Sequence, residues 1–68
     1  MTTCPRCQQD YLERYIDTAS RSVFITCPEC DATWPEGIQP ASTNFQDLES
    51  FLGSNGLSWE AAQALGQV

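Results

Sequence analysis

Polar and apolar residues alternate with a period close to two in the first half of the chain, a pattern typical of β-strands. Loose alternation over residues 10–16 predicts a first strand that has no wholly polar face. Residues 22–27 are rich in β-branched and aromatic side chains and are expected to form the central strand. Residues 17–21 hold little apolar content and are expected to turn between these two strands, and a short third strand is expected over 31–34.

The periodicity changes after residues 35–40, where two prolines and one glycine exclude regular structure. Apolar residues then recur at helical spacing from Phe45 to Leu52, and a capping-box sequence over residues 43–46 marks the start of this pattern. Gly53 is a natural stop. One short helix is therefore predicted between the capping box and Gly53.

A second short helix is expected over Trp59–Leu65, with Ser58 as its N-cap and Glu60 in its first turn. Residues 44–66 would then form a helical hairpin. Its large apolar side chains are expected to pack on the sheet as the main core, because so small a domain seldom leaves apolar area unused. The alternative is that part of this face stays open for a partner. The side chains concerned are Phe45, Leu48, Phe51, Leu52, Leu57, Trp59 and Leu65.

Cysteine spacing adds the strongest chemical signal. The chain carries two CxxC pairs, Cys4-Pro-Arg-Cys7 and Cys27-Pro-Glu-Cys30. This spacing is typical of one structural zinc site, in which four thiolates surround a single Zn2+. A chain of 68 residues also needs such a staple, because a core of this size supplies only about 3–5 kcal/mol. The predicted ligands are Cys4, Cys7, Cys27 and Cys30.

Other roles for these cysteines fit less well. The first residues lack the basic and apolar regions of a secretory signal, and residues 38–46 are too polar and too few to span a bilayer, so a cytoplasmic location is expected. A reducing compartment favours metal over two disulfides. A thioredoxin-like site needs one pair at the start of a helix. Catalytic zinc needs an open coordination position, and the chain has no histidine.

The expected fold class is a small metal-stapled α+β domain that occupies residues 1–68 as a single unit. A zinc ribbon, built on a β-hairpin and a three-stranded sheet, is expected over residues 1–35. A linker over 36–43 leads to the short C-terminal helical hairpin over 44–66. The fold leaves no room for a deep pocket, so an enzyme is not expected.

The net charge of the chain indicates which kind of partner it binds. Nine Asp and Glu residues face three arginines and no lysine, for a formal net charge of −6. Four thiolates and one Zn2+ would bring the metal-bound protein to about −8. Phosphate binding relies on Lys and Arg that release counterions, so direct nucleic-acid binding is disfavoured. A basic protein surface is the expected partner.

The two CxxC pairs and the trailing Asp31-Ala-Thr-Trp34 resemble the zinc-ribbon fold over about half of the chain. The whole arrangement, a ribbon followed by a linker and an apolar tail, is similar to short acidic bacterial zinc-ribbon proteins associated with toxin loci. That resemblance implies an immunity or inhibitor protein that blocks a basic, nuclease-like toxin. The alternative is an adaptor that docks on the transcription or translation machinery.

Acidic residues on or beside the ribbon are the expected contacts with such a partner. A strongly acidic protein is steered rapidly to a positive cleft, and nuclease-like proteins present such clefts because they bind polyanions. The residues assigned to this surface are Glu13, Asp17, Glu29, Asp31 and Glu36.

Overall fold

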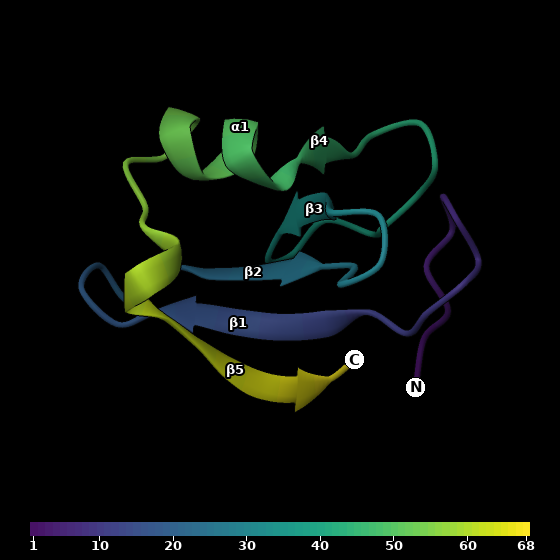
Figure 1. The fold of residues 1–68 in the computed structure, drawn as a ribbon, viewed down its shortest axis with the longest axis horizontal. Helices are drawn as coiled ribbons and strands as arrows, with labels where there is room; N and C mark the ends of the chain where they lie inside the picture. The colour runs from purple at the N-terminus through teal and green to yellow at the C-terminus, as the bar shows by residue number, and fades with distance from the viewer.

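The computed structural model describes residues 1–68 and shows a five-stranded antiparallel sheet with the strand order β4-β3-β2-β1-β5 (Figure 1). One short α-helix and one 3-10 turn, η1, accompany the sheet. The elements are β1 (Glu13–Asp17), β2 (Val23–Thr26), β3 (Ala32–Pro35), β4 (Gln46–Asp47), α1 (Leu48–Ser54), η1 (Trp59–Ala61) and β5 (Ala62–Gln67). No helix has the length and apolar character needed to cross a bilayer.

The three strands expected in the first half of the chain are present as β1, β2 and β3, and each pairs antiparallel with the next. The β1–β2 hairpin closes through two backbone bonds: Asp17 N–H donates to the Ser22 carbonyl at 2.8 Å, and Arg21 N–H donates to the Asp17 carbonyl at 2.7 Å. Arg21 adopts a left-handed conformation with φ of 66°, which reverses the chain. The turn predicted over residues 17–21 is therefore confirmed.

The predicted C-terminal helical hairpin is wrong in its second half. Ser58 does cap a turn, because its side chain accepts the amide of Glu60, but the turn is the single 3-10 turn η1. The chain then extends as β5 along the free edge of β1, with Ile16 opposite Gln63. A short isolated helix is marginal in water, whereas the open edge of β1 satisfies the same backbone groups by pairing.

In the tail, by which we mean residues 44–66, the first predicted helix differs from the structure at its start and at its end. The N-cap of α1 is Asp47, whose side chain accepts the amide of Glu49, and the capping box predicted over residues 43–46 does not form. Residues 46 and 47 instead pair with β3 as β4. The helix also continues through Gly53 to Ser54. The expected linker is anchored, because the Trp34 indole N–H donates to the carbonyl of Ala41 at 3.2 Å.

Side chains pack on both faces of the sheet. On one face, the buried Trp34 and Ile25 pair across β2 and β3 and join a cluster that contains two of the cysteines. On the other face an aromatic row crosses four elements. Its ring pairs are Trp59 with Tyr15 at 4.8 Å, Tyr15 with Phe24 at 5.8 Å, and Phe24 with Phe51 at 5.5 Å.

The tail side chains are divided between the core and the surface. Phe51 is buried, and Phe45 packs in part against the cysteine-bearing cluster. Trp59 and Leu65 are 47% and 53% exposed. The expectation that the whole tail builds the core is therefore correct for Phe51 and in part for Phe45. It is incorrect for Trp59 and Leu65, which are exposed.

Candidate metal centre

Two turns of the same backbone geometry carry the four cysteines; we call residues 4–7 the first knuckle and residues 27–30 the second knuckle. In the first, Gln8 N–H donates to the Cys4 carbonyl at 3.0 Å; in the second, Asp31 N–H donates to the Cys27 carbonyl at 2.9 Å. The residue after each second cysteine is left-handed, with φ of 56° at Gln8 and 64° at Asp31. The proline at the second position of each pair has a fixed φ suited to the tight turn. The repeated Cys-Pro-X-Cys sequence therefore folds twice into the same turn.

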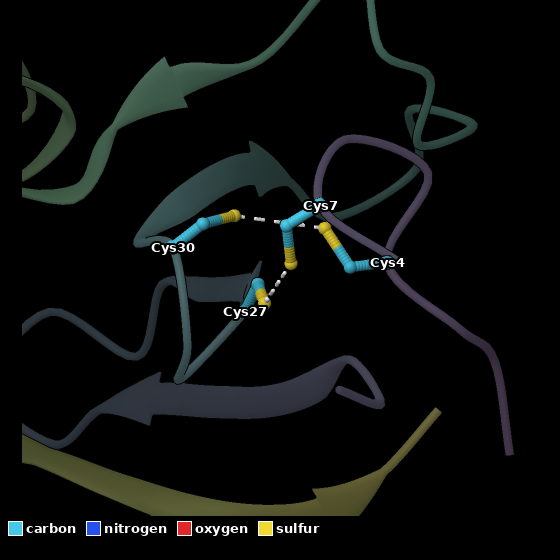
Figure 2. A group of neighbouring side chains, drawn as sticks. All are labelled: Cys4, Cys7, Cys27 and Cys30. Carbon is cyan, nitrogen blue, oxygen red and sulfur yellow. Dashed lines mark hydrogen bonds between the residues drawn. The ribbon is translucent and has the colours of Figure 1, made fainter. Parts of the chain in front are cut away.

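Figure 2 shows the two knuckles facing each other, so that the four sulfur atoms converge. All four Sγ atoms lie within 4.8 Å of one another. Across the knuckles, Sγ of Cys4 lies 3.7 Å from that of Cys30, and Sγ of Cys7 lies 3.6 Å from that of Cys27. A tetrahedral metal with bonds to sulfur of about 2.3 Å places its sulfurs about 3.8 Å apart. The cluster can therefore hold one metal ion, as the cysteine spacing predicts.

Burial of the site is uneven. Cys4 and Cys27 are fully buried in the cluster that also contains Leu12 and Trp34, whereas Cys7 and Cys30 are half-buried. The fully buried Trp34 thus packs in the same cluster as the ligands. All four cysteines are free thiols. A metal held here would be shielded on one side by the sheet and would approach solvent on the other.

The thiol protons are held with unequal strength. Burial opposes ionisation of Cys4, but the backbone amides of Cys7 and Arg6 and the neighbouring sulfurs outweigh it and lower the pKa of Cys4 to about 7. Burial raises the pKa of Cys27 to about 12 and also raises the pKa of Cys30. Because a metal binds thiolates, its entry must displace the protons of Cys27 and Cys30 at neutral pH.

Arg6 links the knuckles to the tail. Its guanidinium donates from Nη1 to the carbonyl of Cys30 at 3.1 Å and lies 4.3 Å from the centre of the Phe45 ring. Its backbone amide also donates to Sγ of Cys4 at 3.4 Å. No local pattern in the sequence indicates this role of Arg6, because Cys30 and Phe45 are distant in the chain. The cation lies beside the site, where it would offset the negative charge of a metal with four thiolates.

The acids assigned to a partner do not form one group. Glu29 and Asp31 are exposed at the second knuckle. Glu36 pairs with Nε of Arg14 at 3.2 Å, and Glu13 accepts the hydroxyl of Tyr15 at 3.1 Å. The structure therefore separates these residues into a pair at the knuckle and two that are engaged with their neighbours.

Asp17 lies inside the molecule, with 2% of its surface exposed. Its Oδ2 accepts the hydroxyl of Ser20 at 2.8 Å and the amide of Ser20 at 2.9 Å, so the carboxylate organises the β1–β2 turn. These bonds lower the pKa of Asp17. Its burial corrects the assignment of Asp17 to the partner surface.

Two acids outside the predicted partner surface lie beside the second knuckle. Asp47 of β4 pairs with Ala32, directly after the knuckle, and Glu49 follows in the first turn of α1. The amide of Leu48 also donates to the carbonyl of Asp31 at 2.9 Å, which holds the start of α1 against the knuckle. We call Glu29, Asp31, Asp47 and Glu49 the knuckle acids. The pairing of β4 with β3, which brings them together, has no local sequence signal.

Four closely spaced cysteines would fill all four coordination positions of one ion and leave none open for a substrate. This arrangement is typical of a structural metal site. Comparison with known proteins found no matching family model, no matching curated protein and no matching solved structure. The interpretation of the site therefore rests on its own geometry.

Proposed function

We propose that this protein is a zinc-stabilised acidic binding protein that docks on a basic protein surface. The four cysteines hold one structural Zn2+, and the fold stapled by this ion presents carboxylates to the partner. The free thiols suit a reducing compartment such as the cytoplasm. No reaction is assigned to the protein.

The choice of zinc follows from the donor set. Four thiolates in a tetrahedral array favour zinc or iron among the common metals, and zinc adds no redox chemistry to a structural site. The cross-knuckle sulfur separations of 3.6 and 3.7 Å are close to the tetrahedral value of about 3.8 Å. The expected stoichiometry is one Zn2+ per chain.

The choice of a basic protein partner follows from one observation: most acidic side chains lie at the surface, whereas two of the three arginines are engaged within the protein. Of the nine acidic side chains only Asp17 is buried. Of the three arginines, Arg6 is engaged with Cys30 and Phe45, and Arg14 is paired with Glu36. Arg21 alone makes no side-chain contact of this kind. The surface is thus strongly acidic and has little free cationic charge for phosphate groups.

The narrower form of this proposal is an immunity or inhibitor protein for a basic, nuclease-like toxin, which the resemblance of the ribbon and tail implies. Charge complementarity supports this form, since a cleft that binds polyanions attracts a protein with a net charge of −6. An adaptor of the transcription or translation machinery would use the same acidic surface. The identity of the captured partner separates these two forms.

Capture on the immobilised zinc-bound protein tests the proposal. Proteins retained from the native host extract should be basic and should be released as salt is raised, because screening shortens the steering field to about 8 Å at physiological ionic strength. Reversal of Glu29 and Asp31 to lysine should lower the association rate, while reversal of the paired Glu36 serves as the matched control. Micromolar or tighter binding to DNA or RNA at physiological salt, lost when the arginines become alanine, would contradict the proposal.

A further inference from the structure

β5 lies at an open edge of the sheet. It pairs with β1 on one side, and no strand follows it in the order β4-β3-β2-β1-β5. Figure 1 shows β5 in yellow at the margin of the sheet, with no other segment drawn beyond it. The other edge strand, β4, is only two residues long. β5, with six residues, is therefore the longer free edge of the molecule.

The direction of the backbone groups of β5 follows from one hydrogen bond. Thr18 N–H donates to the carbonyl of Ala61 at 2.9 Å, which directs the backbone of Ala61 toward β1. Ladder bonds alternate along an antiparallel strand, so Gln63 also faces β1 while Ala62 and Ala64 face outward. The amide of Ala62 already donates to the carbonyl of Trp59. The carbonyl of Ala62 and both backbone groups of Ala64 remain directed at the open edge.

Side chains give this edge little protection. Natural edge strands are commonly blocked by lysine, proline or inward-pointing charges. Residues 62–67 contain no charged residue and no proline. A bulge opposite Arg14 and Tyr15 disturbs the later part of the strand, where Gly66 has φ of 120°. On the face shared with Tyr15, the regular part carries only the methyl side chains of Ala62 and Ala64, which leaves room there for side chains of a further strand.

The chemistry around this edge selects a basic occupant. Ala64 lies opposite Tyr15, on the face of β1 where Glu13 accepts the tyrosine hydroxyl. The Trp59 ring packs at a tilt against the Tyr15 ring and is 47% exposed, and the exposed Glu60 lies in the 3-10 turn that leads into β5. Because only alanine methyl groups intervene, long cationic side chains on an added strand can cross β5 toward these carboxylates and rings.

We propose that β5 is the docking edge, and that an extended basic segment of the partner adds to it as a sixth strand. Backbone bonds to Ala62 and Ala64 would supply the pairing, and Lys or Arg at alternate positions would lie over Tyr15 and Trp59 and near Glu13. This inference rests on the proposed function and names its mode of contact. The knuckle acids, near the opposite edge of the sheet, then act in steering rather than in docking.

A capped eight-residue peptide of alternating Lys and Val is the probe, titrated into the zinc-bound protein and followed by amide NMR. The Ala64 amide should show one of the largest shifts and at least tenfold slower hydrogen exchange in the complex. The same peptide methylated on the backbone nitrogens that face β5 keeps its charge but cannot pair. Its dissociation constant should be at least tenfold higher.

The matched protein variants are Ala64→Pro, which removes an outward amide that makes no internal bond, and Ala64→Thr, which keeps it. Ala64→Pro should raise the dissociation constant at least tenfold, and Ala64→Thr should leave it within twofold. Each variant is also prepared with Co2+ in place of Zn2+, and an absorption spectrum equal to that of the unaltered protein shows that the variant is folded. If Ala64→Pro does not fold, the comparison of the two peptides on the unaltered protein decides the question.

Three results would overturn the inference. Equal affinity for the plain and methylated peptides would show that basic segments bind by charge alone, which leaves the proposed function intact. Capture of a basic partner together with no binding of either peptide would show that the partner docks elsewhere than on β5, and it would also leave the proposed function intact. A dimer of the free protein that Ala64→Pro converts to monomer would show that a second copy occupies the edge. Failure of the proposed function differs from all three, because then no basic protein is captured at all.

Discussion

Phe51→Ala tests whether the tail belongs to the core. Phe51 is 5% exposed, and its ring lies 5.5 Å from that of Phe24 on the face of the sheet opposite the cysteine-bearing cluster. Removal of a buried phenylalanine costs about 3–5 kcal/mol, which combines the lost transfer energy with the cavity left behind. For a domain of this size each kcal/mol shifts the thermal midpoint by roughly 4–8 °C. The expected fall in the midpoint is therefore at least about 12 °C.

Thermal unfolding followed by circular dichroism, with one equivalent of metal present, measures this change. Leu65→Ala is the matched control, because Leu65 is 53% exposed and its truncation should alter stability by less than about 0.5 kcal/mol. The cobalt spectrum of Phe51→Ala at low temperature should match that of the unaltered protein, since no cysteine touches this ring pair. Equal midpoints for Phe51→Ala and the unaltered protein would refute the assignment of Phe51 to the core.

Three further predictions concern the knuckles. Gln8→Gly should stabilise the protein by about 0.5–1 kcal/mol in urea unfolding, because glycine relieves the left-handed φ of 56°, and Gln8→Ala should give no gain. The apparent metal affinity, measured by chelator competition, should fall at least about 100-fold for each unit drop in pH near neutrality. The reason is that Cys27 and Cys30, whose pKa values are raised, must each lose a proton when the metal binds. A tenfold change or less would contradict this prediction. Arg6→Ala should lower stability by about 0.5–1 kcal/mol and speed metal loss to a chelator, whereas Arg21→Ala should do neither.

The parts of the fold that local sequence controls could be predicted. The four cysteines meet because each Cys-Pro-X-Cys turn forms locally, and the segment between the two turns closes into the hairpin of β1 and β2. Alternation and β-branched content identified three strands, although β1 begins at Glu13 rather than at residue 10. These signals lie within a few residues of the structure that they predict.

The C-terminal strand could not be predicted in this way. Trp59, Ala62 and Leu65 recur every three residues, a spacing that favours a helix. The outcome depended on the free edge of β1, which is distant in sequence and offers backbone partners to whatever segment reaches it. One exposed helical turn and an extended strand therefore replaced the second helix.

The surroundings of the cysteine site were also beyond local reasoning. Arg6 meets Cys30 only once the two knuckles face each other, and it meets Phe45 only after the tail has folded back. Asp47 approaches the second knuckle only through the pairing of β4 with β3. For Asp17, in contrast, the exposure expected from the sequence was wrong although a local signal was present. Its place in a turn suggested exposure, but Ser20 turns back to bond its carboxylate and the residue is buried. An Asp followed by Ser at this spacing is a local signal that could have indicated an internal role.

Native mass spectrometry of the protein, expressed and purified under reducing conditions with zinc in the medium, tests the central claim most directly. The expected species is a compact chain that carries one Zn2+ on Cys4, Cys7, Cys27 and Cys30, and that unfolds when a strong chelator removes the metal or when any of these residues becomes serine. A compact chain without metal, held by two disulfides under the same conditions, would contradict it.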